Sequence, residues 1–244
     1  MRFLILSDIH ANWEALEAVL RDAARQYEAV LCLGDIVGYG PNPNEVTAWV
    51  RENADVVIRG NHDKACAGID GIGSFNPIAQ ASSQWTRAEL HARHAEWLAQ
   101  LPRGPLQVES FDLVHGAPDD EDRYIFHVHD AEAGFRHAGA ALTFFGHNHV
   151  QGGFIREDTR PYHVFRLDCL PPALAIDPYR HYLINPGAVG QPRDGDARAS
   201  YCFYDSGRWT VEYRRVEYDI RTVQEKILDA GLPEELAFRL TTGS

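Results

Sequence analysis

The chain has 244 residues, of which 45% are hydrophobic and 24% are charged, and this is the composition of an ordinary globular protein. The formal net charge of −12 argues against non-specific binding to nucleic acid or to an anionic membrane, because both partners are themselves negatively charged. No apolar run approaches the roughly 20 residues of a membrane-spanning helix. A small anionic substrate remains compatible with this charge, because a bound metal ion reverses the local field.

The first part of the chain alternates between strand and helix patterns. We interpret the apolar run Phe3–Ser7 as a strand and not as a signal peptide, because it is short and Asp8 ends it, so we expect a cytoplasmic protein. Trp13–Tyr27 has apolar residues at helical spacing, behind Asn12 as a candidate N-cap. The next predicted strands and helices are Ala29–Leu33, Asn44–Arg51, Asp55–Ile58 and one or two helices over residues 77–100.

The second part of the chain is rich in strand patterns until a final helical stretch at residues 219–240. The predicted strands are Gln107–Glu109, Phe111–Val114, Leu142–Phe145, His163–Leu167, Tyr182–Ile184, Tyr201–Tyr204 and Trp209–Tyr218. Alternating elements followed by consecutive strands favour an α/β fold in which two β-sheets pack face to face with helices outside. We expect residues 1–244 to form a single domain. The cysteines show no CxxC pairing and are predicted to be reduced packing residues: Cys32, Cys66, Cys169 and Cys202.

Five of the predicted strands end in polar residues of a similar kind. These endings are Asp8-Ile9-His10, Gly34-Asp35, Gly60-Asn61-His62-Asp63, His115-Gly116 and Gly146-His147-Asn148-His149. In α/β sheets, ligands bind beyond the carboxyl ends of the strands, so these side chains are predicted to converge in one crevice. The neighbouring glycines are expected to let the backbone turn sharply. A single such ending is usually a turn, but five in this order indicate a site.

The residue types at these strand ends indicate a metal centre. Mixed carboxylate and imidazole ligands suit divalent Mn, Fe, Ni, Co or Zn. The candidate ligands are too many for one tetrahedral zinc and suit two ions that share a bridging carboxylate: Asp8, His10, Asp35, Asn61, His115, His147 and His149. Two such ions can clamp a phosphoryl group between them. Asn61 is then a ligand, and His62 beside it is a candidate acid.

These motifs resemble the calcineurin-like metallophosphoesterase superfamily, whose pattern is DxH, GD, GNH[DE], a lone His and GHxH. The match spans residues 3–149, and the later stretch Asn185–Arg193 resembles the NPGSVGQPR segment of small bacterial members. The resemblance implies a four-layer αββα sandwich of two mixed β-sheets. It also implies hydrolysis of a phosphate ester by a hydroxide that bridges two metal ions and attacks phosphorus in line.

The resemblance implies a role for each motif residue. The first ion is held by Asp8, His10 and His149, the second by Asn61, His115 and His147, Asp35 bridges them, and His62 protonates the leaving oxygen. Asp35 and His62 are therefore the expected catalytic residues. Histidine suits the acid role because its usual pKa lies near working pH. Asp63 is expected either to orient an imidazole or to cap a loop.

One departure from the family bears on the substrate. Where Ser/Thr protein phosphatases have GDxxDRG, this chain has Gly38 and Tyr39 in place of the second Asp and the Arg. This argues against phosphoprotein hydrolysis, with Arg193 and Arg59 as candidates to replace the missing phosphate-binding arginine. The predicted substrate contacts are Asn61, His62, Asn12, Tyr39 and Arg193, while for the last three capping, packing or a solvated loop is the alternative.

We expect the substrate to be a small phosphomonoester or phosphodiester, with nucleotides among the candidates. One alternative is a dinucleoside polyphosphate hydrolase, because small relatives have this activity. An alternative of another class is a non-catalytic protein-interaction scaffold, although such relatives usually lose the metal ligands or the acid histidine, and this chain has them all. The expected partner is a small phosphorylated substrate and not nucleic acid or a membrane, and no oligomeric state is indicated.

Two further histidine pairs are not assigned to the site. His127 and His129 form a second HxH, but they follow Tyr124–Phe126 and not a glycine, so we predict a polar loop or cap segment. His91 and His94 are three residues apart on a predicted helix and are expected to form a surface pair.

Overall fold

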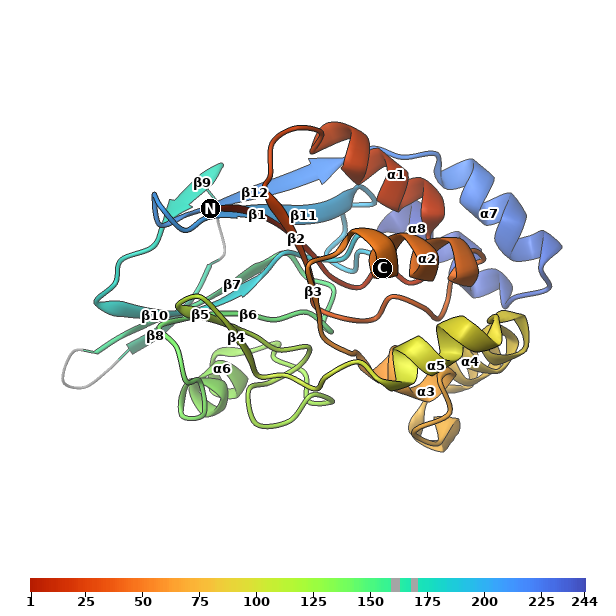
Figure 1. The fold of residues 1–244 in the computed structure, drawn as a ribbon, viewed down its shortest axis with the longest axis horizontal. Helices are drawn as coiled ribbons and strands as arrows, with labels where there is room; N and C mark the ends of the chain where they lie inside the picture. The colour runs from red at the N-terminus through yellow and green to blue at the C-terminus, as the bar shows by residue number, and fades with distance from the viewer. Residues whose placement is uncertain (159–162, 168–170) are drawn as a thin grey trace.

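Two six-stranded β-sheets lie face to face in the computed structural model, which describes residues 1–158, 163–167 and 171–244 (Figure 1). The first sheet has the order β3-β2-β1-β11-β12-β9. Its strands are β1 (Arg2–Leu6), β2 (Ala29–Cys32), β3 (Val56–Val57), β9 (Ala173–Ala175), β11 (Ala199–Asp205) and β12 (Thr210–Val216). The strands β1, β2 and β3 are parallel, whereas β11 pairs with β1 antiparallel.

The second sheet has the order β4-β5-β6-β10-β7-β8. Its strands are β4 (Leu106–Val108), β5 (Phe111–Leu113), β6 (Leu142–Phe144), β7 (Gly152–Glu157), β8 (His163–Arg166) and β10 (Arg180–Asn185). The strands β5, β6 and β10 are parallel, and the remaining pairings are antiparallel. Both sheets are therefore mixed, as expected.

Aromatic side chains fill the space between the two sheets. Phe3 and Tyr204 from the first sheet meet Phe111 and Phe144 from the second, and the ring of Phe111 stands edge-on to Phe3 and Tyr204 at centroid distances of 5.4 and 5.1 Å. Each buried ring of this size contributes about 1.5–3 kcal/mol through the loss of apolar surface from water. This shared core holds the two sheets in a fixed relation.

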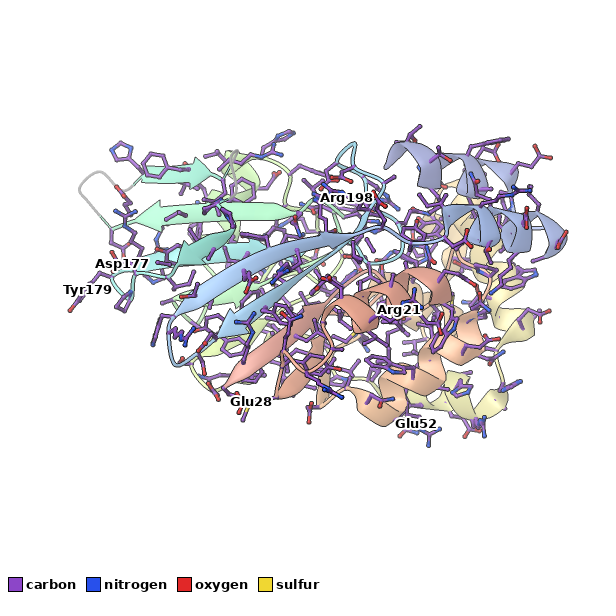
Figure 2. All side chains as sticks on the ribbon, turned by 90° about the horizontal axis from the view of Figure 1, so that it is seen from above. Arg21, Glu28, Glu52, Asp177, Tyr179 and Arg198 are labelled. Carbon is purple, nitrogen blue, oxygen red and sulfur yellow. The ribbon has the colours of Figure 1, made fainter. Side chains whose placement is uncertain are left out.

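Helices cover the outer faces and the ends of the sheets. They are α1 (Trp13–Asp22), α2 (Pro43–Asn53), α3 (Asn61–Cys66), α4 (Pro77–Glu89), α5 (Ala92–Ala99), α6 (Val128–Phe135), α7 (Ile220–Asp229) and α8 (Glu234–Thr242), with a short 3₁₀ turn at Ile72–Ser74. The helices α1 and α2 pack on the first sheet and α6 packs on the second, so the four-layer αββα sandwich is confirmed (Figure 1). Their outer faces are polar, as Arg21 and Glu52 show (Figure 2).

Local sequence features explain the helix boundaries. The side chain of Asn12 accepts a hydrogen bond from the amide of Ala15 at 3.1 Å, which confirms the predicted N-cap of α1. The helix ends at Asp22, five residues before the predicted end at Tyr27. The helices predicted over residues 77–100 are α4 and α5. Ala79 on α4 and Leu98 on α5 are buried against the rest of the chain, and so is Leu90, which directly follows α4.

Three of the four cysteines lie within the described residues, and all three are buried free thiols: Cys32, Cys66 and Cys202. Burial raises the pKa of Cys66 to about 12, so its thiol stays protonated and packs as an apolar group. Cys169 lies outside the described residues. Within the described part of the chain, no helix is both long enough and apolar enough to cross a membrane.

Candidate metal centre

The carboxyl ends of the parallel strands meet at one end of the sandwich and bring the polar motifs together. Two overlapping groups of buried ligand atoms form there and share one carboxylate. The first group is Asp8, His10, Asp35 and His149, and the second is Asp35, His115 and His147. Within each group the ligand atoms all lie within 4.8 Å of one another. The Oδ1 atom of Asn61 joins the second group, at 3.2 Å from Nε2 of His115.

The rings of His10 and His149 face each other in an arrangement that calls for a cation. The Nδ1 atom of His10 lies 3.1 Å from the carbonyl oxygen of Val37, and Nδ1 of His149 lies 2.6 Å from that of Gln191. Since a carbonyl oxygen only accepts, both Nδ1 atoms carry the hydrogen and both Nε2 atoms present lone pairs. These Nε2 atoms are only 3.1 Å apart, and two lone pairs at this distance repel unless a cation binds both.

The ring of His115 in the second group is also oriented by a backbone carbonyl oxygen. Its Nδ1 atom donates to the carbonyl oxygen of Leu33 at 2.8 Å, and its Nε2 atom faces Oδ1 of Asn61 and, at 3.4 Å, Oδ2 of Asp35. Burial lowers the pKa of His115, but the nearby Asp35 carboxylate outweighs burial and raises this pKa to about 10. A proton on Nε2 therefore balances the carboxylate until a metal ion takes its place. The donor set and its unbalanced lone pairs fit two divalent ions.

Asp8 and His147 are oriented by hydrogen bonds from their surroundings. The carboxylate of Asp8 accepts the backbone amide hydrogen of His147 at 3.1 Å and the hydroxyl hydrogen of Ser7 at 2.7 Å. Burial raises the pKa of Asp8 to about 7. The Nε2 atom of His147 lies 3.1 Å from the carbonyl oxygen of Asp122, which leaves Nδ1 as the nitrogen available to an ion.

Five of the candidate ligands have a left-handed backbone conformation. Their φ angles lie between 48° and 68°, at Asp8, His10, Asp35, His147 and His149. For non-glycine residues this conformation costs on the order of 1–3 kcal/mol each and persists only where the surroundings enforce it. Backbone hydrogen bonds between the loops provide this enforcement, for example from the amide of His10 to the carbonyl oxygen of Asp35 at 2.9 Å. Strain concentrated in this way marks the loops as a functional site.

Glycines beside the ligands serve two different purposes. Gly34 has φ of +94° and makes the sharp turn that the sequence suggested. Gly60 and Gly146 are not in the left-handed region, so a turn does not explain them. A Cβ atom on Gly60 would lie 2.1 Å from Oδ1 of Asp35, and one on Gly146 would lie 2.0 Å from Oγ of Ser7. These two glycines allow the backbone to approach the site closely.

The GNHD motif forms the start of α3 and not an open turn. Gly60 is the N-cap, and the amide of His62 donates to Oδ1 of Asp35 at 2.8 Å. The carboxylate of Asp63 accepts from the amides of Gly60, Ile36 and Val37, so it joins the helix start to the loop after β2. Of the two roles expected for Asp63, the structure shows the capping one.

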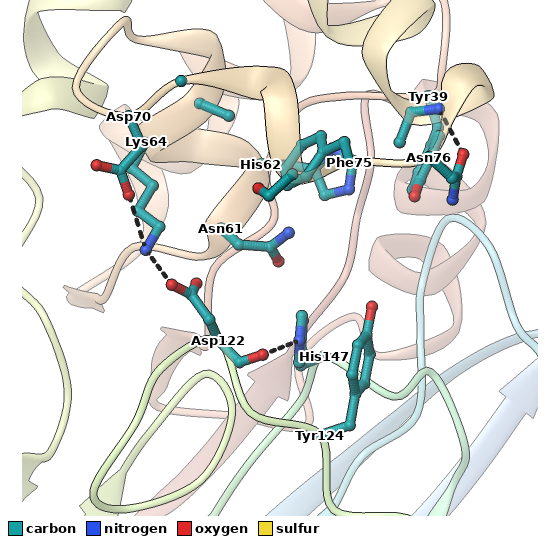
Figure 3. A pocket seen from close by; sticks show the side chains of 14 residues that line it. Tyr39, Asn61, His62, Lys64, Asp70, Phe75, Asn76, Asp122, Tyr124 and His147 are labelled. Carbon is teal, nitrogen blue, oxygen red and sulfur yellow. Dashed lines mark hydrogen bonds and ion pairs between the residues drawn. The ribbon is translucent and has the colours of Figure 1, made fainter.

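His62 lines a pocket of about 460 Å³ beside the two ligand groups (Figure 3). The rings of Tyr39 and Phe75 flank its imidazole at centroid distances of 4.4 and 4.7 Å. Burial lowers the pKa of His62 to about 4, although the Asp35 carboxylate opposes this shift. In this structure the imidazole of His62 is therefore neutral near pH 7.

The comparisons with known proteins agree with this geometry. The calcineurin-like phosphoesterase superfamily domain matches residues 1–207. The chain belongs to this superfamily. A metallophosphoesterase from Sphaerobacter thermophilus is 42% identical in sequence, and its crystal structure superposes with a TM-score of 0.88, covering 100% of this chain and 99% of that one.

Two further proteins are also similar over nearly the whole chain. An uncharacterized protein of Methanocaldococcus jannaschii is 35% identical, covering 98% of this chain and 97% of its own length. A hypothetical protein of Pyrococcus horikoshii OT3 is 22% identical and shares the fold with a TM-score of 0.79, covering 100% and 98%. The last two helices of this phosphoesterase-superfamily chain, α7 and α8, lie beyond the residues that the superfamily domain matches.

The residues predicted to contact the substrate have different partners in the structure. Both polar groups of the Asn12 side chain are used, by the amide of Ala15 and by the carbonyl oxygen of Gly190, which fits the packing alternative. Arg59 forms a two-pronged ion pair with Glu121 at 2.8 and 3.1 Å and is therefore not free for a phosphate. Tyr39 lines the pocket and also packs on the ring of His10. Arg193 is half-buried, and its guanidinium lies 5.6 Å from the centre of the Tyr39 ring.

The histidine pairs outside the motifs lie away from the two ligand groups. His127 is the exposed N-cap of α6 and His129 is exposed on that helix, so the predicted polar segment is present but is helical from Val128 onward. His91 is exposed, whereas His94 is buried, and the prediction of a surface pair is wrong for His94.

Several residues that shape the pocket were not predicted from the sequence, among them Lys64, Asp122 and Tyr124. Lys64 binds the carboxylates of Asp122 and Asp70 at 2.6 and 3.1 Å, and the carbonyl oxygen of Asp122 holds His147 (Figure 3). Tyr124 stacks on His147 at a centroid distance of 3.7 Å. Lys64 directly follows the GNHD motif and is one of only two lysines, which was an available signal. Asp122 and Tyr124 lie in a loop without a recognisable pattern.

Proposed function

We propose that this protein hydrolyses small phosphate esters with two divalent ions bound at the candidate metal centre. The observation that carries the proposal is the convergence of two groups of buried ligand atoms on the shared carboxylate of Asp35. The residues that would hold the first ion are Asp8, His10 and His149, those for the second are Asn61, His115 and His147, and Asp35 belongs to both. Divalent Mn, Fe, Ni, Co or Zn suits this donor set.

When bound, the two ions supply an activated water and neutralise charge on the phosphoryl oxygens. The residues of the chain supply the positioning. Oδ2 of Asp35 lies 3.6 Å from Nε2 of His10 and 3.4 Å from Nε2 of His115, so this carboxylate stands between the two groups. Its Oδ1 atom is fixed by the amide of His62. The carboxylate that joins the metal positions therefore also fixes the candidate acid.

His62 is placed to give a proton to the leaving oxygen. It lines the pocket with Asn61 and His147, and the flanking rings of Tyr39 and Phe75 limit water around its imidazole. A pocket of about 460 Å³ lies in the range of small-ligand sites and suits a small ester better than a folded phosphoprotein. The engaged Arg59 removes one candidate for the phosphate-binding arginine of protein phosphatases.

The test is an assay of metal-stripped protein supplied with Mn²⁺, using p-nitrophenyl phosphate, its bis ester and diadenosine tetraphosphate in parallel. We expect turnover of at least one substrate, with loss in Asp35→Asn and His62→Ala. The matched controls Asp112→Asn and His94→Ala change buried residues outside the site and should keep turnover. The substrate that reacts distinguishes monoester, diester and anhydride chemistry. Folded, Mn²⁺-loaded protein that hydrolyses none of the three would contradict the proposal and favour a non-catalytic scaffold.

A further inference from the structure

Two arginines, Arg193 and Arg239, lie side by side at the edge of the metal centre. Nη2 of Arg193 and Nη1 of Arg239 both donate to Oε1 of Gln191, at 2.9 and 3.3 Å. Both side chains are half-buried, and among the described residues neither guanidinium has a carboxylate within ion-pair distance. The buried Nε atom of Arg193 has no hydrogen-bond partner in the described part of the chain.

This pairing is unusual for a chain with a net charge of −12. Carboxylates are close in sequence, but Asp194 pairs with Arg215 and Asp196 pairs with Arg198. Burial and the charge of Arg193 both lower the pKa of Arg239. Arg193 has the Tyr39 side chain as a further neutral partner, which does not balance its charge. Two half-buried positive charges that share one amide oxygen repel each other, and an anion between them would remove the repulsion.

The ring of Tyr39 lies between the arginine pair and the metal centre. The amide of Arg193 donates to the carbonyl oxygen of His149 at 3.1 Å, and its guanidinium lies 5.6 Å from the centre of the Tyr39 ring. That ring packs on His10 and His62 and lines the pocket. The arginine pair is therefore next to the position expected for the phosphoryl group, but it is separated from the ligand atoms by Tyr39 and Gln191.

The second arginine comes from a part of the chain beyond the matched superfamily domain. Arg239 is on α8, and that helix packs through Leu236 and Leu240 on the cluster that contains Tyr39. The α7–α8 hairpin lies at the same end of the molecule as α3, α4 and α5, beside the ends of the parallel strands (Figure 1). The hairpin thus supplies a charged group to a site that is otherwise built from residues before 207.

We propose that Arg193 and Arg239 bind a second anionic group of the substrate, next to the phosphoryl group at the metal centre. Guanidinium groups suit this task because their planar N–H groups match the oxygens of phosphate and carboxylate. The inference rests on the proposed function and narrows its substrate class to small compounds that carry a phosphoester or phosphoanhydride and one further phosphate or carboxylate.

The test measures equilibrium binding by calorimetry to full-length, Mn²⁺-loaded protein in a His62→Ala background, which prevents consumption of the ligand. The probes are inorganic phosphate with one anionic group, tripolyphosphate with several, and 3-phosphoglycerate with a carboxylate as its second anion. We expect Arg239→Ala to weaken the binding of tripolyphosphate or 3-phosphoglycerate at least about tenfold. The affinity for inorganic phosphate should stay within about twofold of its value without this substitution. Arg221→Ala, an arginine of α7 paired with Glu225, is the matched control and should change neither.

A second variant separates loss of the site from loss of folding. Gln191→Glu places a carboxylate between the two arginines with almost no change in shape. It should raise the melting temperature by relieving the repulsion between the two arginines. It should also weaken the binding of the two-anion probes, tripolyphosphate and 3-phosphoglycerate, as strongly as Arg239→Ala does. If Arg239→Ala weakens the binding of phosphate and of the two-anion probes equally, or weakens neither, the second-anion subsite is overturned.

Hydrolysis and binding of the second anion are separate readouts. A protein that hydrolyses no ester but binds the two-anion probe through Arg239 contradicts the proposed function and keeps the subsite. A protein that hydrolyses an ester but binds every probe independently of Arg239 keeps the function and overturns the subsite.

Discussion

The Nε2 atoms of His10 and His149 lie 3.1 Å apart. In each ring the hydrogen is on Nδ1, which donates it to a backbone carbonyl oxygen, so both Nε2 atoms present lone pairs. The protein thus holds two lone pairs against each other in a buried site. This contact costs free energy in the metal-free protein and is relieved when a cation binds both nitrogens. The folded state therefore favours an ion that the unfolded chain cannot bind in the same way.

We expect Mn²⁺ to stabilise the wild-type protein and EDTA to reverse the effect. A free ion concentration of one hundred times the dissociation constant gives about 2.7 kcal/mol, which corresponds to a rise in melting temperature on the order of 5–10 °C. His149→Ala should lose most of this rise, whereas His94→Ala, a buried histidine outside the site, should retain it. Scanning calorimetry with and without Mn²⁺ checks this, and an equal rise in both variants would contradict it.

Ion binding should release protons. The pKa of His115 is raised to about 10 by the Asp35 carboxylate against the effect of burial, and burial raises the pKa of Asp8 to about 7. Between these two values His115 is protonated in the metal-free protein, so an ion must displace its proton. Below about pH 7, Asp8 takes up a proton as well and the affinity falls further.

Calorimetric titration with Mn²⁺ in two buffers of different ionisation enthalpy measures this release. We expect close to one proton released per protein between the two pKa values, and more below the lower one. Binding that takes up protons, or that does not depend on pH across this range, would show that the ion does not occupy these positions.

Gly60→Ala should damage the metal centre through a direct clash. The added Cβ atom would lie 2.1 Å from Oδ1 of Asp35, so the shared carboxylate or the start of α3 must shift. We expect about 1–3 kcal/mol of destabilisation and weaker Mn²⁺ binding. Gly71→Ala is the matched control, because no atom of the described residues lies within 4 Å of its Cβ position and its φ of −71° suits alanine. Urea unfolding and Mn²⁺ titration of both variants measure the two effects. Equal stability and equal Mn²⁺ affinity of the two variants would contradict the predicted clash at Gly60.

Lys64→Met should weaken metal binding although Lys64 is not a ligand. Its amine holds the side chain of Asp122, whose carbonyl oxygen orients His147 (Figure 3). Outer partners of this kind typically contribute 10–100-fold in metal affinity. Lys226→Met changes the only other lysine, which pairs with Glu14 away from the pocket, and should leave the affinity unchanged. Mn²⁺ affinities of the two variants that differ by less than about twofold would contradict the positioning role.

The sequence predicted the convergence of the ligands because parallel strands place their carboxyl ends together. The endings at Asp8, Asp35 and Asn61 follow three parallel strands of one sheet, and those at His115 and His147 follow two of the other. No knowledge of the helices was needed for this step. The role of each ligand at an ion remains a prediction, which the observed grouping supports.

Other features were not predictable because they depend on contacts distant in sequence. The six residues of α3 are too few to show helical periodicity, and β7 begins with Gly152 and Gly153, which hide a strand pattern. A Cβ atom on Gly153 would lie 2.2 Å from the carbonyl oxygen of Leu183, a contact formed only after the sheet assembles. In the same way, nothing near Arg239 in the sequence links it to Arg193.

The central claim is that two ions bound around Asp35 are required for hydrolysis. The most direct measurement is a titration of metal-stripped protein with Mn²⁺ in which bound ion and hydrolysis rate are followed together, for wild type and Asp35→Asn. We predict that the rate rises with the second equivalent of ion, and that Asp35→Asn lowers it by more than about 100-fold, because even outer partners of ligands contribute 10–100-fold. Full turnover with one ion or none, or wild-type turnover in Asp35→Asn, would contradict the account.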